Sequence, residues 1–172
     1  MPIAHHTKTK GDLGVAKAYA DLVEQGYVVL FPATEHAPFD LVAYCEGEFV
    51  RIQVKYRAAR LGAVTVRFKS FWADRHGVHA VPMDKSEVDV VCIYCPDTDE
   101  CYYIRPSEHR ASITLRVDPT RNSQVARVLL ASRYRSLREI DTAPRHDGLP
   151  LDGSSDAEEA NAGGTARGLC QT

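Results

Sequence analysis

The stretch HAPFDLVAYCEGEFVRIQVKY, residues 36–56, predicts a β-hairpin on which much of the fold depends. An apolar run at 39–44 precedes Gly47, a favourable turn residue, and a second run at 49–56 alternates between apolar and polar side chains. Successive side chains of a strand point to opposite faces, so alternate residues of the second run enter the core. The residues expected on the core face are Val50, Ile52, Val54 and Tyr56.

The opposite face of the hairpin gathers three polar side chains of different chemistry. A tight two-residue turn pairs Cys45 with Glu48 and, counting back along both strands, places Asp40 opposite Gln53. Opposed residues have Cβ atoms roughly 5 Å apart, and Lys55 is then a diagonal neighbour of the aspartate. A register shift of one residue would separate the three groups, so the prediction depends on that turn.

A carboxylate, an amide oxygen and an amine at this spacing suit metal-assisted phosphodiester hydrolysis. Asp40 and the side-chain oxygen of Gln53 are hard oxygen ligands of the kind that Mg²⁺ accepts, and Mn²⁺ is the alternative cation. The metal would lower the pKa of a bound water, while Lys55 would orient that water and meet the negative charge of the phosphate. A solvated polar sheet face would show the same alternation, and this alternative stays open on pattern alone.

The rest of the chain predicts an α+β domain with a mixed, mainly antiparallel sheet flanked by helices. Asp12 would cap a first helix that Gly26 ends, and Asn122 or Ser123 would cap a second. The segment 70–87 is expected to be a loop with one short strand. The remaining elements are expected at 12–25 (helix), 27–32, 64–69, 88–95, 100–106 and 112–118 (strands) and 124–137 (helix).

Several segments, taken in order, resemble the group I intron-associated homing endonucleases of the PD-(D/E)xK nuclease superfamily, in the variant with Gln at the second acidic position. The segments are TKTKGD, DLVEQGYVVLFP, APFDLVAY, VRIQVK, VDVVCIYCPDTDECYYI and RNSQ, which together cover about residues 8–135. The resemblance implies a restriction-endonuclease-like core in a domain of residues 1–140 and a Mg²⁺-dependent DNA endonuclease activity. It further implies Asp40 and Gln53 as metal ligands, Lys55 as the catalytic lysine, and a homo-oligomer, either a dimer or a tetramer.

The chain departs from this family pattern on its first helix. Members usually carry a glutamate there that faces the metal, and the aligned residue is Val15. Asp12 or Glu35 is a candidate to supply the missing carboxylate. Two alternatives therefore accompany the endonuclease: a Holliday-junction-resolvase-like nuclease, and a catalytically inactive DNA-binding relic of the same fold.

Basic residues concentrate around the predicted site and favour double-stranded DNA as the partner. Lysine and arginine neutralise phosphates in a salt-dependent manner that carries little sequence information. Solvated strand ends would also account for such a set of charges. The residues expected to contact DNA are Lys8, Lys10, Arg51, Arg57, Arg60, Arg67 and Lys69.

Composition sets the remaining expectations for this chain of 172 residues with a net charge of −2. Residues 141–172 hold six acids against two arginines and few large apolar side chains, which predicts a disordered acidic tail. Neither a secretion signal nor a membrane span is evident, so the cytoplasm is expected. Cys92 and Cys95 have opposite strand parity, which argues against a zinc site completed by Cys101 and His109.

Overall fold

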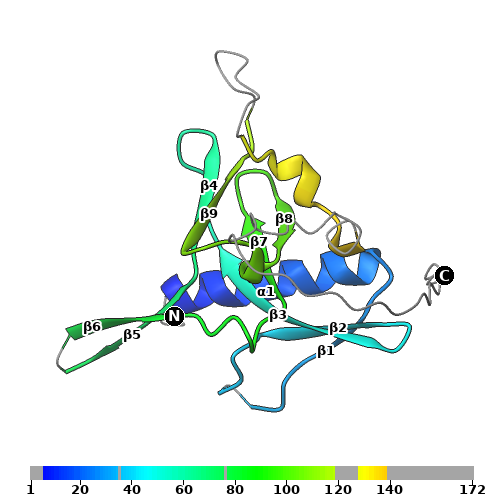
Figure 1. Cartoon of the computed structure of the whole chain (residues 1–172), viewed down its shortest axis with the longest axis horizontal. Helices are drawn as coiled ribbons and strands as arrows, with labels where there is room; N and C mark the ends of the chain where they lie inside the picture. Colours follow the sequence, from blue (N-terminus) through cyan, green and yellow to red (C-terminus); the bar gives the residue numbers. More distant parts are fainter. Residues whose placement is uncertain (1–5, 35, 76, 119–127, 139–172) are drawn as a thin grey trace, which may run out of the picture.

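A computed structural model of the chain describes residues 6–34, 36–75, 77–118 and 128–138. This part of the chain contains a five-stranded sheet of order β1-β2-β3-β7-β8, with one long helix, α1 (His6–Glu24), lying across it (Figure 1). Only the β3–β7 pair is parallel within that sheet. The strands are β1 (Val28–Leu30), β2 (Leu41–Cys45), β3 (Glu48–Tyr56), β7 (Val90–Cys95) and β8 (Glu100–Ile104). The predicted α+β class with a mixed, mainly antiparallel sheet is confirmed.

Helix α1 begins at His6, six residues before the predicted start, and ends as predicted. Gly26 adopts a φ of +85°, its N–H donates to the carbonyl of Val23 at 2.9 Å, and the N–H of Tyr27 donates to Leu22 at 3.0 Å. These two hydrogen bonds form a Schellman motif, in which a left-handed glycine satisfies the last carbonyls of a helix. Within the described residues, no helix is long and apolar enough to cross a membrane.

The hairpin of β2 and β3 has the predicted register. Cys45 lies opposite Glu48 and Leu41 lies opposite Ile52, so Asp40, the residue before β2, comes opposite Gln53. The turn residue Glu46 takes a φ of +50° and Gly47 one of +90°, the two positive angles that a tight type I′ hairpin turn requires.

Two further pairs of strands stand apart from the central sheet (Figure 1). In the first ribbon, β4 (Ala63–Arg67) pairs antiparallel with β9 (Ser112–Arg116), and both strands lie where they were predicted. The second ribbon joins β5 (Lys69–Asp74) to β6 (Gly77–Pro82) and projects beyond the core. The prediction of a loop with one short strand at 70–87 was therefore wrong, because the segment forms a complete hairpin.

The core divides into two apolar clusters, one on each face of the central sheet. The first lies between α1 and the sheet and includes Leu22, Leu41 and Ile52, with Val50, Val54 and Tyr56 packed against it, as predicted. The second lies between β7–β8 and the β4–β9 ribbon, and includes Val64, Val66, Ile93, Ile113 and Leu115. The ribbon therefore covers the face of the sheet that α1 leaves open.

The C-terminal part of the described chain differs from the prediction. Leu130 forms a parallel bridge with Arg116, the carbonyl of Leu129 accepts a hydrogen bond from Arg116 at 2.7 Å, and a short 3₁₀ helix, η2 (Ala131–Tyr134), follows. The α-helix predicted at 124–137 is wrong over 128–136, because backbone pairing with β9 and the 3₁₀ turn replace the α-helical hydrogen bonds. A second 3₁₀ helix, η1 (Pro106–Glu108), joins β8 to β9. The start of the predicted helix and the acidic tail lie outside the described residues.

Candidate active site

The loop before β2 is fastened to β3 by backbone and side-chain hydrogen bonds at Asp40. Its N–H donates to the carbonyl of Ile52 at 2.9 Å, which continues the hairpin ladder by one residue. Its carboxylate oxygen Oδ2 accepts a hydrogen bond from the N–H of Val54 at 2.6 Å. The carboxylate is therefore held against the strand between the two other predicted site residues, Gln53 and Lys55.

Gln53 is oriented by the same loop. Its amide nitrogen Nε2 donates to the carbonyl oxygen of Pro38 at 3.2 Å, and a carbonyl can only accept. The amide oxygen Oε1 is consequently fixed on the other side of the group, where it is buried and has no hydrogen-bond partner among the described residues. A buried acceptor without a partner costs free energy unless a donor or a cation meets it.

Asp40 and Lys55 are half-buried and act on each other electrostatically. Burial raises the pKa of the Asp40 carboxyl, and the hydrogen bond from Val54 and the charge of Lys55 partly offset this rise. Burial lowers the pKa of the Lys55 amine, Asp40 opposes that change, and the nearby cation of Arg57 adds to it. The Asp40 carboxylate and the Lys55 ammonium thus favour each other's charged forms, although burial opposes both charges. This combination of burial and a charged partner is common at catalytic sites.

These oxygens fit a hard divalent cation. A carboxylate and a neutral amide oxygen without a partner are oxygen donors of the type that Mg²⁺ accepts, and they leave further positions for water and phosphate. Within the described residues, no group of three His, Cys, Asp or Glu side chains gathers as a metal site. Of the two groups, only the Asp40 carboxylate would therefore offer a negative charge to the cation.

The position aligned with the missing helix glutamate lies on the other face of the sheet. Val15 packs with the cluster between α1 and the sheet, beside Gly14, whose Cα approaches Val54 and Tyr56. Asp12 is exposed on the first half of α1, and Glu35 lies outside the described residues. Among the described residues, Val15 is thus a packing residue.

The predicted DNA-contacting residues separate into two groups. Arg51 is held within the protein, because its guanidinium bonds Asp89 at 2.8 and 2.9 Å and the carbonyl of Ser86 at 2.8 Å. Asp89 in turn accepts from the N–H of Arg51, and this ion pair joins β3 to the start of β7. Asp89 was not predicted from the sequence, although it directly precedes a buried strand and therefore lies at the end of that strand.

The other cations lie on the surface. Arg57 follows β3, donates to the carbonyl of Tyr56 at 2.8 Å and lies close enough to affect Lys55. The ammonium of Lys10 lies 5.7 Å from the ring centroid of Tyr56, which brings the first half of α1 to this end of β3. The remaining four are exposed, namely Lys8, Arg60, Arg67 and Lys69.

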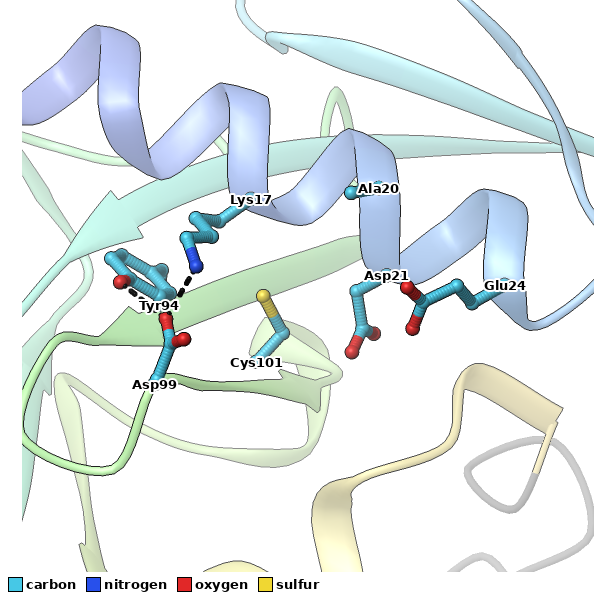
Figure 2. A pocket seen from close by; sticks show the side chains of 7 residues that line it. All are labelled: Lys17, Ala20, Asp21, Glu24, Tyr94, Asp99 and Cys101. Carbon is cyan, nitrogen blue, oxygen red and sulfur yellow. Dashed lines mark hydrogen bonds and ion pairs between the residues drawn. The ribbon is translucent and has the colours of Figure 1, made fainter.

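A separate pocket lies on the α1 side of the sheet (Figure 2). Lys17 and Tyr94 both point to Asp99 there, at 2.6 and 2.7 Å. Tyr94 belongs to the α1-side cluster, whereas Gln53 and Lys55 pair with residues of the other face, so the pocket is not part of the candidate site. Cys92 and Cys95 lie in different clusters, which agrees with the argument against a zinc site.

Comparison with known proteins finds a matching family model and similar solved structures. A family model described as PD-(D/E)XK endonuclease matches residues 5–137. Among solved structures, the bacterial homing endonuclease I-Ssp6803I is similar with a TM-score of 0.60 and 23% sequence identity, over 75% of this chain and 88% of that chain. No significant match was found among curated proteins. The structural likeness confirms the restriction-endonuclease-like core.

Proposed function

The chain belongs to the PD-(D/E)XK endonuclease family, and from this premise we propose that it is a metal-dependent DNA endonuclease that hydrolyses phosphodiester bonds, as homing endonucleases do. The observation that carries the proposal is the placing of three groups on one sheet face. Asp40 bonds the backbone between Gln53 and Lys55, and the amide oxygen of Gln53 is buried without a partner among the described residues.

In this proposal Asp40 and Gln53 would hold a Mg²⁺ or Mn²⁺ ion. When bound, such an ion acidifies a coordinated water and neutralises charge that develops at phosphorus. The hydrogen bond from Gln53 to the carbonyl of Pro38 fixes the orientation of the amide, so its oxygen would not have to be ordered when an ion binds.

Lys55 supplies the positive charge beside this pair of oxygens. Its ammonium orients the attacking water and binds a non-bridging phosphate oxygen, whose charge grows in the transition state. Partial burial strengthens this interaction, because the surrounding dielectric is lower than that of water.

The partner is double-stranded DNA, whose phosphates are contacted by the half-buried Arg57 and by the exposed cations Lys8, Lys10, Arg60, Arg67 and Lys69. Arg51 is left out of this set, because its guanidinium already binds Asp89. Following the family resemblance, we propose a homo-oligomer, a dimer or a tetramer, that brings several sites to one duplex. Sedimentation of the full chain with and without DNA would measure the subunit number, and cell fractionation would test the expected cytoplasmic location.

Incubation of supercoiled plasmid with the full chain tests the activity. We expect nicked and linear products with Mg²⁺ or Mn²⁺, none with a chelator, and none from Lys55→Ala. A matched control is Lys17→Ala, which removes a lysine on the other face of the sheet and should leave cleavage unchanged. Absence of DNA binding at low salt would refute a nucleic-acid function altogether, and cleavage restricted to four-way junctions would identify a resolvase-like nuclease.

A second candidate, an inactive DNA-binding relic, is favoured by two observations. Val15 is partly buried against the α1-side cluster, at the position where the family resemblance implies a glutamate, and the described residues offer no group of three acidic, histidine or cysteine ligands. This candidate predicts DNA binding without cleavage in either cation. Cleavage of plasmid DNA by the unaltered chain would exclude the relic.

A further inference from the structure

The β4–β9 ribbon has one apolar and one polar face. Val64, Val66, Ile113 and Leu115 are buried in the cluster against the central sheet. Their neighbours in sequence point to the other side, where exposed or half-buried residues pair across the two strands. The outer face consists of Ala63 opposite Arg116, Thr65 opposite Thr114, and Arg67 opposite Ser112.

This outer face has hydrogen-bonding groups and positive charge, and no acid. The hydroxyls of Thr65 and Thr114 lie 2.9 Å apart, so the pair uses one hydrogen and keeps acceptor and donor capacity toward solvent. Arg67 is exposed and forms no ion pair among the described residues. The guanidinium of Arg116 donates a hydrogen bond to the carbonyl of Leu61 at 2.9 Å. This holds its charge at the end of the ribbon opposite to Arg67.

The dimensions of the ribbon match a DNA groove. Neighbouring strands lie about 5 Å apart, and the major groove of B-DNA is about 12 Å wide, which admits a two-stranded ribbon with its side chains. Each strand has five residues, or roughly 17 Å, which is about the length of five base-pair steps. The apolar face anchors the ribbon on the protein, so the polar face can meet the DNA without exposing the core.

The ribbon also lies on the same side of the central sheet as the candidate active site. Gln53 pairs with Val91 and Lys55 pairs with Ile93, and paired residues of neighbouring strands point to the same face. Val91 and Ile93 belong to the cluster that the ribbon covers. A duplex on that side can therefore contact both the ribbon and the site.

We propose that the outer face of the β4–β9 ribbon enters the major groove and reads base sequence, with Arg67, Thr65 and Thr114 as specificity-determining residues. This inference rests on the proposed endonuclease function. Arg67 would pair its guanidinium with the two acceptors of a guanine, and the threonines would meet base edges or thymine methyl groups. Exposed cations at the ends of the ribbon, Arg60 and Lys69, would contact the flanking phosphates.

Selection of bound duplexes from a random DNA library tests the proposal. The wild-type chain should enrich a motif. Arg67→Lys should lose about tenfold of the preference at one base pair, because lysine keeps the charge but not the paired donors. Its affinity for random-sequence DNA should stay within about twofold, since the phosphate contribution depends on charge. Thr65→Val with Thr114→Val, which keep side-chain shape, should relax neighbouring positions.

The outcomes separate this inference from the proposed function. If both sets of variants enrich the wild-type motif unchanged, the ribbon does not read bases, while the nuclease proposal stands. If the wild-type chain binds DNA and enriches no motif, base reading is likewise overturned. If it binds no DNA, the proposed function and this inference fail together. Lys17→Ala, which changes a residue on the other face of the sheet, should enrich the wild-type motif unchanged, and thermal unfolding of each variant verifies the fold.

Discussion

The side-chain amide of Gln53 donates a hydrogen bond to the carbonyl oxygen of Pro38 at 3.2 Å, while its own oxygen is buried without a partner among the described residues. A glutamate at this position could not make the same contact, because an ionised carboxylate has no hydrogen to donate. The loop conformation and the amide of Gln53 are therefore matched, and a neutral side chain at this position is part of how the chain builds the candidate site.

Gln53→Glu should exchange stability for cation affinity. Loss of the Pro38 hydrogen bond is expected to cost about 1 kcal/mol, which lowers the melting temperature by roughly 2–4 °C without metal. The added carboxylate should bind Mg²⁺ more tightly than the amide does. In thermal unfolding scans, Mg²⁺ should then raise the melting temperature of the variant more than that of the wild type. Equal shifts in both proteins would show that residue 53 does not bind the cation.

Asp40→Asn should separate folding from catalysis. The asparagine oxygen can still accept the hydrogen bond from Val54, and a partly buried charge is removed, so the melting temperature should change little. Plasmid cleavage should fall by at least about 100-fold, because the site loses its acidic ligand. A variant that is folded and equally active would exclude Asp40 from the reaction.

Gly14→Ala should stabilise the protein. Gly14 lies within α1, and a Cβ there would meet Val54 at 3.5 Å and Tyr56 at 3.6 Å, which are ordinary contacts. Alanine in a helix is favoured over glycine by about 0.5–1 kcal/mol, and urea unfolding should show this gain. Gly62→Ala is the contrasting control, because Gly62 has a φ of +71° and a Cβ would lie 2.8 Å from the Asp118 carboxylate. If Gly14→Ala is destabilising instead, α1 packs more tightly on β3 than these distances imply.

The ion pair of Asp89 with Arg51 should make stability depend on pH in the acid range. Hydrogen bonds from Arg51 hold the pKa of Asp89 below its ordinary value of 3.8. The pair therefore contributes fully above that value, and its contribution is lost as the pH falls through 3.8 and below. Because both side chains are partly exposed, we expect Asp89→Asn to cost about 1 kcal/mol at pH 7. The difference from wild type should shrink steadily as the pH falls below 3.8, and a constant difference would contradict the pair.

The sequence was sufficient to predict features whose determinants are local. The turn at Glu46-Gly47 sets the register of the hairpin, and the register brings Asp40 opposite Gln53. Gly26 ends α1 because a left-handed residue is needed there. The metal roles of these residues stay predictions, since they depend on a ligand rather than on the chain.

Features that depend on distant contacts were not predicted. Leu130, Ala131, Tyr134 and Leu137 have helix-like spacing, yet pairing of Leu130 with Arg116 takes up the backbone. The early start of α1 was missed because its first turn is polar and carries no apolar period. The tie between Gln53 and the Pro38 carbonyl has no sequence signal, since a backbone acceptor can be supplied by any residue.

The parallel pairing of β3 with β7 also has a consequence for folding during synthesis. It joins Ile52 to Val90, so the whole segment carrying β4, β5 and β6 must be made before the two strands can meet. The β2–β3 hairpin can close locally, as short-range contacts form quickly, but its free edge stays uncovered until β7 leaves the ribosome. Expression at a slower translation rate would prolong the lifetime of that open edge, and a chaperone that shields it should increase the yield of native protein.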